Sequence, residues 1–274
     1  MVNYYRPAGI AEALSLMASH GGNYVLMYQP PRAKHVKEWL SGDIIDLSEA
    51  GLDQVSVKNN ELVIGSMVSI ETLYRADAIH GLADGLLSQA AKVSATQAMR
   101  NLATLGGVLM NPVFPAEIIL ALLVLDAQVL VTDSGTPEIR IPIEKFVAEA
   151  NPKLPRGSLL AGVAIPLNEK LKGVLERVAR TRSDTSIVSV AVTADGTLNN
   201  PKIAIFGASP LPKRYHAAES LLASNPLTEA SIEQCLERIP EDTQAVSNYR
   251  GSAEYRQAMA VVLTRRALLS LKKS

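Results

Sequence analysis

Thr104, Gly106 and Gly107 are the residues of this 274-residue sequence that best suit a ligand-binding loop. They lie in the stretch ATLGGVLMNPVFPAEIILALLVLDAQVLV, residues 103–131, where the glycine pair precedes the most apolar segment of the chain. Glycine lets a backbone approach a ligand closely and exposes its amide groups, and Thr104 adds a hydroxyl group. Such a set suits a pyrophosphate. A simple turn before a buried helix explains the same residues, so spacing alone leaves both interpretations open.

Motifs for several other kinds of chemistry do not occur. The sequence contains no Gly-x-Gly-x-x-Gly, P-loop, His-Glu-x-x-His, Cys-x-x-Cys or Gly-x-Ser-x-Gly pattern. Its four histidines are scattered, and its single cysteine, Cys235, excludes a disulfide framework or a thiolate metal cluster within the chain. We therefore expect no metal site, assign no catalytic residue, and do not expect a self-contained hydrolase or NAD-binding enzyme. Cys235 lies in a helical pattern and is expected to be a small core residue.

The charge and hydrophobicity of the chain argue against nucleic acid and membranes as partners. The formal net charge is zero, which argues against nucleic acid because binding to phosphates requires a basic surface. The longest uncharged apolar run, residues 118–125, is too short to cross a bilayer, and the N-terminal residues lack the layout of a signal peptide. A cytoplasmic protein with no membrane association is expected. Hydrophobic residues make up 47% of the chain, enough for a sizeable core.

Hydrophobic periodicity predicts the elements that must position the glycine loop. Residues 52–69 predict a hairpin around Asn59 and Asn60, and Ser69 is expected to cap the helix that follows. A single helix is expected over 82–102, before the loop, and a helix buried on all sides is expected over 116–125. The other elements expected in this half are a helix at 9–19 and strands at 23–28, 43–48, 127–133, 137–143 and 157–167.

The remainder of the chain changes character after a boundary expected near 166–175. Residues 174–209 predict three alternating strands, with a turn at Asp195 and Gly196. Helices are expected at about 214–224, 228–238 and 252–271. Three strands followed by three helices indicate a second α+β domain.

The stretch RNLATLGGVLMNPVFPAEIILALLVLDAQVLV resembles the second flavin loop of the FAD-binding (medium) subunits of the molybdenum hydroxylases, the xanthine dehydrogenase and aerobic carbon monoxide dehydrogenase families. The likeness covers nearly the whole chain. YYRPAGIAEALSLMASHG and DIIDLSEAGLDQVSVKNNELVIGSMVSIETLYRA match earlier segments. RTRSDTSIVSVAV, IAIFGASPLPKRYHAAESLL and YRGSAEYRQAMAVVLTRRAL match the C-terminal domain.

This resemblance implies an α+β architecture and a division of labour. The two-subdomain FAD-binding fold would occupy residues 1–168, with subdomains of about 1–55 and 56–168 that hold FAD between them. A small C-terminal α+β domain, with a three-stranded antiparallel sheet and helices, would occupy 169–274. The family's flavin passes electrons between an iron–sulfur subunit and an outside acceptor such as NAD or oxygen. Substrate oxidation takes place on a molybdopterin-binding subunit, so a hetero-oligomer is implied.

The first flavin loop of the family, Ala-Gly-Gly-Thr/Ser-x-Leu, is not present here. An ungapped alignment places Tyr28, Gln29, Pro30, Pro31 and Arg32 in this region, so both glycines are lost. Side chains then occupy the space of the phosphates, and proline has no N–H group to donate. Two lost charge-assisted hydrogen bonds, at about 1.5–3 kcal/mol each, lower affinity by about 100-fold or more. Arg32 offers compensating charge but does not restore the shape of the loop.

The second loop is altered less. Val108 stands where the family has Asn, and Glu117 stands where Asp is usual, so one polar side chain is lost and one charge is moved by a methylene group. Asp184 matches a family Asp near the flavin. A surface turn, or an ion pair with Arg182, explains Asp184 equally well.

Two functions follow from these matches and departures. The chain is an FAD-binding electron-transfer subunit with a variant pyrophosphate site, or it is a flavin-free structural or docking subunit of a molybdenum hydroxylase complex. Binding of a different nucleotide is a third possibility that no specific residue supports. Substrate specificity would lie in another subunit in every case.

Overall fold

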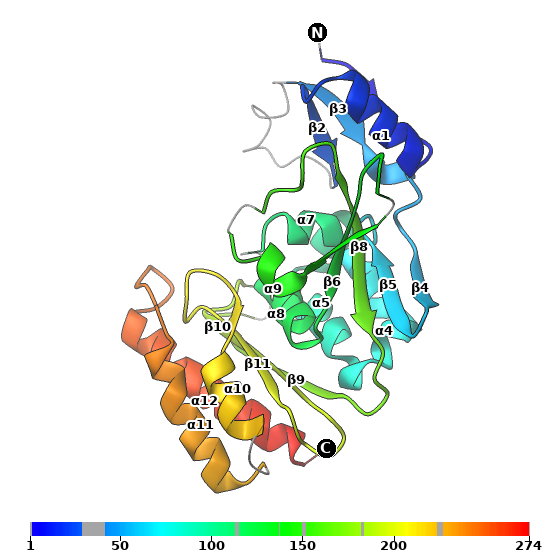
Figure 1. Cartoon of the computed structure of the whole chain (residues 1–274). Coiled ribbons are helices and arrows are strands. Elements are labelled where there is room, and N and C mark those ends of the chain that lie inside the picture. The colour runs from blue at the N-terminus through cyan, green and yellow to red at the C-terminus, as the bar shows by residue number, and fades with distance from the viewer. Residues whose placement is uncertain are drawn as a thin grey trace.

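The computed structural model describes residues 2–28, 42–112, 115–136, 138–149, 152–181, 184–223 and 227–273. Figure 1 shows three successive parts along the chain: a small N-terminal layer, a central part built on the largest sheet, and a C-terminal sheet covered by helices. This arrangement confirms the predicted α+β fold, with two subdomains followed by a smaller C-terminal domain.

The N-terminal part is a parallel sheet covered by one helix. Its elements are β1 (Tyr4–Tyr5), α1 (Ile10–Ser19), β2 (Tyr24–Met27) and β3 (Asp43–Asp46), followed by a 3₁₀ turn, η2 (Leu47–Glu49). The strand order is β1-β3-β2, and both pairings are parallel. Ala13 and Met17, one helical turn apart on α1, are buried against this layer. The structure thus places the end of β2, where Tyr28 follows, at the boundary with the central part.

The central part is an antiparallel five-stranded sheet of order β4-β5-β8-β6-β7. Its strands are β4 (Val55–Lys58), β5 (Glu61–Gly65), β6 (Gln128–Thr132), β7 (Ile139–Pro142) and β8 (Leu159–Pro166). Its helices are α3 (Ile70–Arg75), α4 (Asp77–His80), the 3₁₀ turn η3 (Ala83–Gly85), α5 (Leu86–Ser94), α6 (Gln97–Leu102), α7 (Leu105–Leu109), α8 (Ala116–Val124) and α9 (Ile143–Phe146). The glycine loop lies at the start of α7, which is buried and contacts β8 and α8.

Two local predictions in this part are confirmed. Asn59 and Asn60 both have positive φ, 51° and 62°, and join β4 to β5, as expected for a two-residue hairpin turn. Ser69 caps α3, because its hydroxyl accepts a hydrogen bond from the amide of Thr72 at 3.0 Å.

The prediction of a single helix over 82–102 is wrong. The segment divides into η3, α5 and α6, and the break between the last two lies at Ala95 and Thr96, which are both extended. The side chain of Arg100 stabilises this break, because its Nη1 donates to the carbonyl oxygens of Lys92 and Ala95 at 3.1 and 2.8 Å. A side chain thus satisfies carbonyl groups that lose their helical partners where α5 ends.

The C-terminal sheet has four antiparallel strands, in the order β12-β11-β10-β9. They are β9 (Lys172–Val178), β10 (Val188–Ala194), β11 (Lys202–Phe206) and the two-residue β12 (Lys213–Arg214). The three predicted strands are therefore joined by a short fourth strand, in a segment too brief to show alternation. The helices are α10 (His216–Ala223), α11 (Glu229–Glu241) and α12 (Ala253–Leu271), close to their predicted ranges. Cys235 on α11 is fully buried, as expected, and burial raises the pKa of its thiol to about 12.

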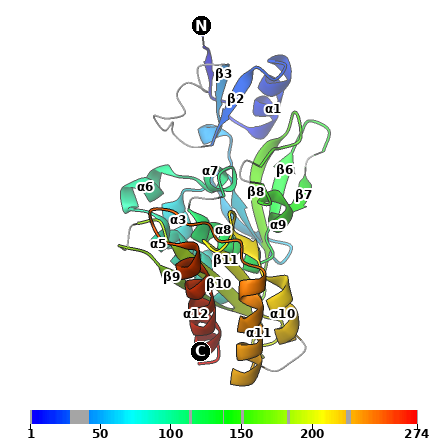
Figure 2. The same ribbon diagram turned by 90° about the vertical axis from the view of Figure 1, so that its left-hand side faces the viewer.

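The C-terminal sheet joins the central part through α8. This helix contacts β10 and β11, whereas α12 contacts β9 and β10 (Figures 1 and 2). Every residue of β10 and of α8 is consequently buried, which confirms the prediction of a fully buried helix over 116–125. Within the described residues, no helix is long and apolar enough to cross a membrane.

Candidate functional site

The second glycine loop forms the N-terminus of α7. Thr104 is the N-cap, and its hydroxyl oxygen accepts a hydrogen bond from the amide of Gly107 at 3.2 Å. The amide of Val108 donates to the backbone oxygen of Thr104 at 3.1 Å. All three residues are buried, so the loop is an interior turn as well as a sequence motif.

The other amide groups at the start of α7 also have acceptors inside the chain. Leu105 donates to the backbone oxygen of Val68 at 2.9 Å, and Gly106 donates to the backbone oxygen of Ser66 at 2.7 Å. A helix N-terminus binds anions through amide groups that lack protein acceptors. The first four amides of α7 therefore offer a phosphate no donor in this conformation.

Tyr28, directly after β2, fills the space beside the glycine loop. A Cβ atom built on Gly106 would lie 2.8 Å from Cδ1 of Tyr28, so the ring packs directly on the glycine. The Tyr28 hydroxyl accepts a hydrogen bond from the amide of Leu160 in β8 at 2.7 Å, and its backbone oxygen accepts one from the hydroxyl of Thr104. The side chain is only 7% exposed, and burial raises the pKa of its phenol.

The contacts of Tyr28 and of the glycine loop show whether the described residues leave room and donors for the FAD pyrophosphate that the resemblance implies. The tyrosine ring occupies the approach to Gly106, and the loop amides and the Thr104 hydroxyl already donate within the chain. The described part of the groove therefore does not fit a pyrophosphate. Gln29 and Arg32, the other predicted first-loop residues, lie outside the described residues. The roles predicted for Tyr28, Thr104, Gly106, Gly107 and Val108 in binding FAD remain predictions.

One buried hydroxyl in this region stands apart from the rest. Ser66 is fully buried, and its Oγ has no hydrogen-bond partner within the described part of the chain. Its Cβ lies 3.1 Å from the position that a Cβ on Gly106 would take. A buried hydroxyl without a partner costs free energy, about 1–3 kcal/mol in protein mutational series, so this atom is the one local feature that suits a ligand.

Glu117 belongs to a different group of residues. It lies in the first turn of α8, where its carboxylate pairs with Nε of Arg177 on β9 at 3.2 Å and accepts a hydrogen bond from the Ser189 hydroxyl at 3.1 Å. Glu117 is 3% exposed. Its charge thus links the central part to the C-terminal sheet across a buried contact.

Asp184 contacts the same guanidinium group, that of Arg177, through a different nitrogen. Nη2 of Arg177 donates to the backbone oxygen of Asp184 at 2.6 Å, and the Asp184 carboxylate pairs with Arg180 at 2.9 Å. Arg180 is the main cause that lowers the pKa of Asp184. The alternative partner, Arg182, lies outside the described residues. Glu117 and Asp184 are therefore joined through Arg177, whereas Thr104 and Gly106 contact Tyr28.

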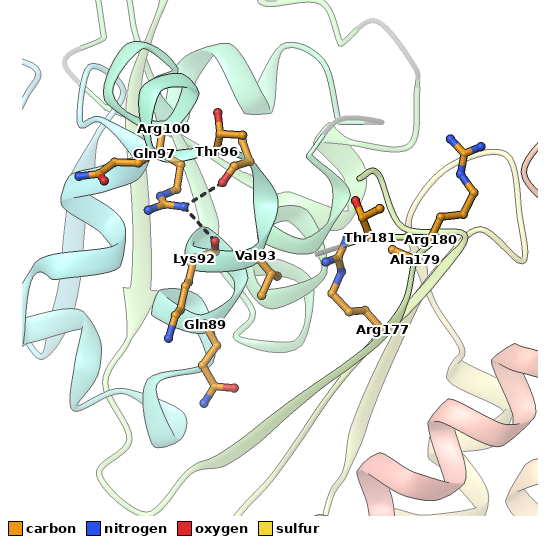
Figure 3. Close-up of a pocket in the computed structure, with 11 residues that line it drawn as sticks. Gln89, Lys92, Val93, Thr96, Gln97, Arg100, Arg177, Ala179, Arg180 and Thr181 are labelled. Carbon is orange, nitrogen blue, oxygen red and sulfur yellow. Dashed lines mark hydrogen bonds between the residues drawn. The ribbon is translucent and has the colours of Figure 1, made fainter. Parts of the chain in front are cut away.

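A cavity of about 1050 Å³ lies between α5, α6 and the C-terminal end of β9 (Figure 3). We call it the cationic cavity. It is lined by Gln89, Lys92, Val93, Ala95, Thr96, Gln97, Arg100, Arg177, Ala179, Arg180 and Thr181. Four of these side chains are cations and none is a carboxylate. Figure 3 shows Lys92 and Arg100 on one side of the cavity and Arg177 and Arg180 on the other.

No expectation from the sequence concerns this cavity, although the sequence contains a signal for it. No Asp or Glu occurs between Gly85 and Ala116, a stretch that contains Lys92 and Arg100. The second group of cations follows about 80 residues later at the end of β9. Only the fold brings the two groups together. No cluster of His, Cys, Asp or Glu suited to a metal ion occurs in the described ranges.

Comparison with known protein families identifies both halves of this architecture. Residues 1–168 match the FAD binding domain in molybdopterin dehydrogenase, and residues 174–271 match the CO dehydrogenase flavoprotein C-terminal domain. The chain belongs to this family. It is an oxidoreductase-family subunit of the molybdenum hydroxylase and xanthine dehydrogenase type, as the sequence predicted.

Individual relatives cover almost the whole chain. The glyceraldehyde dehydrogenase medium chain of Sulfolobus acidocaldarius is 22% identical over 97% of this chain and 96% of its own length. The nicotine 6-hydroxylase medium subunit of Paenarthrobacter nicotinovorans is 27% identical over 98% and 96%. The solved structure of reconstituted CO dehydrogenase from Oligotropha carboxidovorans matches 100% of this chain and 98% of its own, with a TM-score of 0.88 and 22% identity, and so shares the fold.

Proposed function

We propose that this chain is a structural or docking subunit of a molybdenum hydroxylase complex and that it carries no flavin. Tyr28 supports this proposal most directly. Its ring packs on Gly106, in the space that a pyrophosphate would need to reach the loop amides. The subunit keeps the family fold and closes the groove with one of its own side chains.

The hydrogen bonds around Tyr28 support the same conclusion. The tyrosine connects β2 to both walls of the groove, through Thr104 on one side and Leu160 on the other. A bound pyrophosphate would have to break these contacts and the Gly106 and Gly107 hydrogen bonds before it gained its own. A buried donor or acceptor left without a partner costs about 1–3 kcal/mol, so this exchange opposes binding.

The second candidate is the FAD-binding electron-transfer subunit of such a complex, which would pass electrons between an iron–sulfur subunit and an external acceptor. The buried Ser66 hydroxyl favours it, because this atom has no partner among the described residues and lies beside Gly106. The residues Thr104, Gly106 and Gly107 retained from the family loop favour it as well. In that case FAD would displace Tyr28, which would free the Thr104 hydroxyl and the Leu160 amide as donors.

Both candidates share the same partners. The named relatives are medium chains or subunits, which implies other subunits in their complexes. We propose an iron–sulfur subunit and a molybdopterin-binding subunit as the partners of this chain. The isolated chain would oxidise no substrate, because substrate chemistry belongs to the molybdenum subunit.

Calorimetric titration of the purified full-length chain with FAD separates the two candidates. The docking-subunit proposal predicts no saturable heat for the wild-type chain. The Gly107→Val variant is the matched control, because a branched side chain at this glycine would exclude a ligand from the loop. FAD binding by the wild-type chain that is lost in Gly107→Val would overturn the proposal and support the electron-transfer subunit.

A further inference from the structure

The cationic cavity carries more positive charge than its neighbours neutralise. Lys92 has no carboxylate within ion-pair distance among the described residues. Arg100 shares the carboxylate of Glu71 with Arg75, at N–O distances of 2.7 and 2.6 Å, so one anion serves two cations. These three cations also surround one aromatic ring, that of Tyr74, at 5.4–5.8 Å from its centroid.

On the opposite wall, each arginine has a carboxylate partner. Arg177 pairs with Glu117 and Arg180 pairs with Asp184. These bridges leave the charge of Lys92 and one of the two charges around Glu71 without a matching carboxylate. A cavity with low-dielectric walls focuses such a field, so the excess attracts anionic groups.

An exposed aromatic residue lies beside Arg180, one of the cations that line the cavity. Tyr249 is 78% exposed, and its ring lies 5.9 Å from the guanidinium of Arg180 and 5.1 Å from that of Arg250. Near the other wall, Met99 and Leu102 on α6 are 39% and 54% exposed. Exposed tyrosine, methionine and arginine side chains are typical of protein–protein interfaces.

We propose that the cationic cavity and Tyr249 form a docking surface for an acidic segment of a partner subunit. A small anion would use the cations but leave the exposed Tyr249, Met99 and Leu102 without a role. A peptide segment with carboxylate and apolar side chains would use both. That the segment comes from a subunit of the complex rests on the proposed function, whereas the charge and aromatic character of the surface do not.

A labelled acidic peptide tests this surface on the full-length chain. The probe is a fluorescein-labelled octapeptide of alternating glutamate and leucine, followed by fluorescence anisotropy at low salt. We expect saturable binding that weakens as salt is added, because exposed charges are screened. The double variant Lys92→Glu with Arg180→Glu should weaken binding by about tenfold or more, since two attractions become repulsions.

A matched variant and two competitors complete the test. Lys58→Glu with Lys273→Glu makes the same charge change at exposed positions on β4 and beyond α12, and should leave the affinity within about twofold. Tyr249→Ala should weaken peptide binding with no change in charge. Equal loss in both charge variants, no peptide binding, or full displacement of the peptide by equimolar ADP or inorganic phosphate would overturn the proposal.

The outcome is independent of the flavin titration. A chain that binds FAD and also binds the peptide through the cavity would refute the flavin-free function and leave the docking surface standing. A chain that binds neither would retain the proposed flavin-free state and lose this surface.

Discussion

The groove around Tyr28 lies between the N-terminal and central parts, and the cationic cavity lies between the central part and the C-terminal sheet. The two differ in how far their polar groups are satisfied within the chain. In the groove, the loop amides and the Thr104 hydroxyl have acceptors inside the protein, and an aromatic ring fills the remaining space. In the cavity, the space is open and the cations outnumber the nearby carboxylates. The family motif thus marks the place that is closed, whereas residues outside any motif form the open one.

The Tyr28 groove shows how a single side chain can fill the space beside a glycine loop within the family fold. Tyr28 is a large buried residue whose hydroxyl accepts a hydrogen bond from the Leu160 amide and whose backbone oxygen accepts one from the Thr104 hydroxyl. The same residue thus removes space for a ligand and supplies contacts between two subdomains. The glycine pair therefore indicates the family, and the hydrogen bonds of its amides lie within the chain.

The largest expected loss of stability comes from removal of the Tyr28 side chain, which fills the groove. Tyr28→Ala should lower the free energy of unfolding by about 3–5 kcal/mol, because it removes a buried aromatic side chain that joins β2 to β8. Urea unfolding followed by circular dichroism measures this loss. A change below about 1 kcal/mol would show that the ring is not packed in the groove.

Tyr28→Phe separates the ring from its hydroxyl. This variant keeps the packing on Gly106 but leaves the buried amide of Leu160 without an acceptor. The expected loss is about 1–3 kcal/mol, smaller than for alanine. A loss as large as that of Tyr28→Ala would assign the stability to the hydrogen bond rather than to the ring.

Gly106→Ala probes the same contact from the opposite wall. The new Cβ would lie 2.8 Å from the Tyr28 ring and 3.0 Å from the backbone oxygen of Ser66, and such overpacking costs about 1–3 kcal/mol. In a double-mutant cycle with Tyr28→Ala, the two losses should be less than additive because the clash with the ring disappears. Gly81→Ala is the control, since a Cβ there meets no atom within 4 Å and should change stability by less than about 0.5 kcal/mol.

The smallest expected effect is on the pH dependence of stability, to which the Glu71 carboxylate beside the cavity contributes. Hydrogen bonds from Arg75, and then from Arg100, lower the pKa of Glu71. A lowered pKa contributes stability above the ordinary pKa of the group, and this contribution is lost as pH falls through the lowered value. Glu71→Gln should therefore lose less stability than the wild-type chain between neutral pH and about pH 3.

The control for this experiment is a surface pair. Glu233 and Arg265 form an ion pair with both side chains about half exposed, at 53% and 46%. Exposed pairs contribute little to stability. Glu233→Gln should therefore show the wild-type dependence on pH in urea unfolding, and an equal flattening in both variants would refute the assignment to Glu71.

Much of the fold could be predicted from the sequence because local signals agree with tertiary structure. The Asn59–Asn60 turn, the Ser69 cap and the buried helix α8 all follow from residue types at short range. The break between α5 and α6 could not be predicted in this way. It depends on the Arg100 side chain, which folds back onto carbonyl groups of the preceding helix.

The loop residues could be singled out in the sequence, but the surroundings of the candidate site could not be predicted from local signals. The departure at Tyr28 was visible in the sequence, but the fate of its side chain depends on Leu160, which is 132 residues away. The ion pair between Glu117 and Arg177 is equally non-local. The cationic cavity forms where two basic groups that are distant in the sequence come together in the fold, and no local sequence pattern predicts this contact.

The flavin content of the native complex tests the central claim most directly. The chain would be purified with its partners from its own host without added flavin, denatured, and assayed for released FAD by chromatography with fluorescence detection. Closure of the groove by Tyr28 predicts that FAD is absent, or far below one equivalent per chain. A full equivalent of FAD that persists through purification, and is lost in Gly107→Val, would contradict this account.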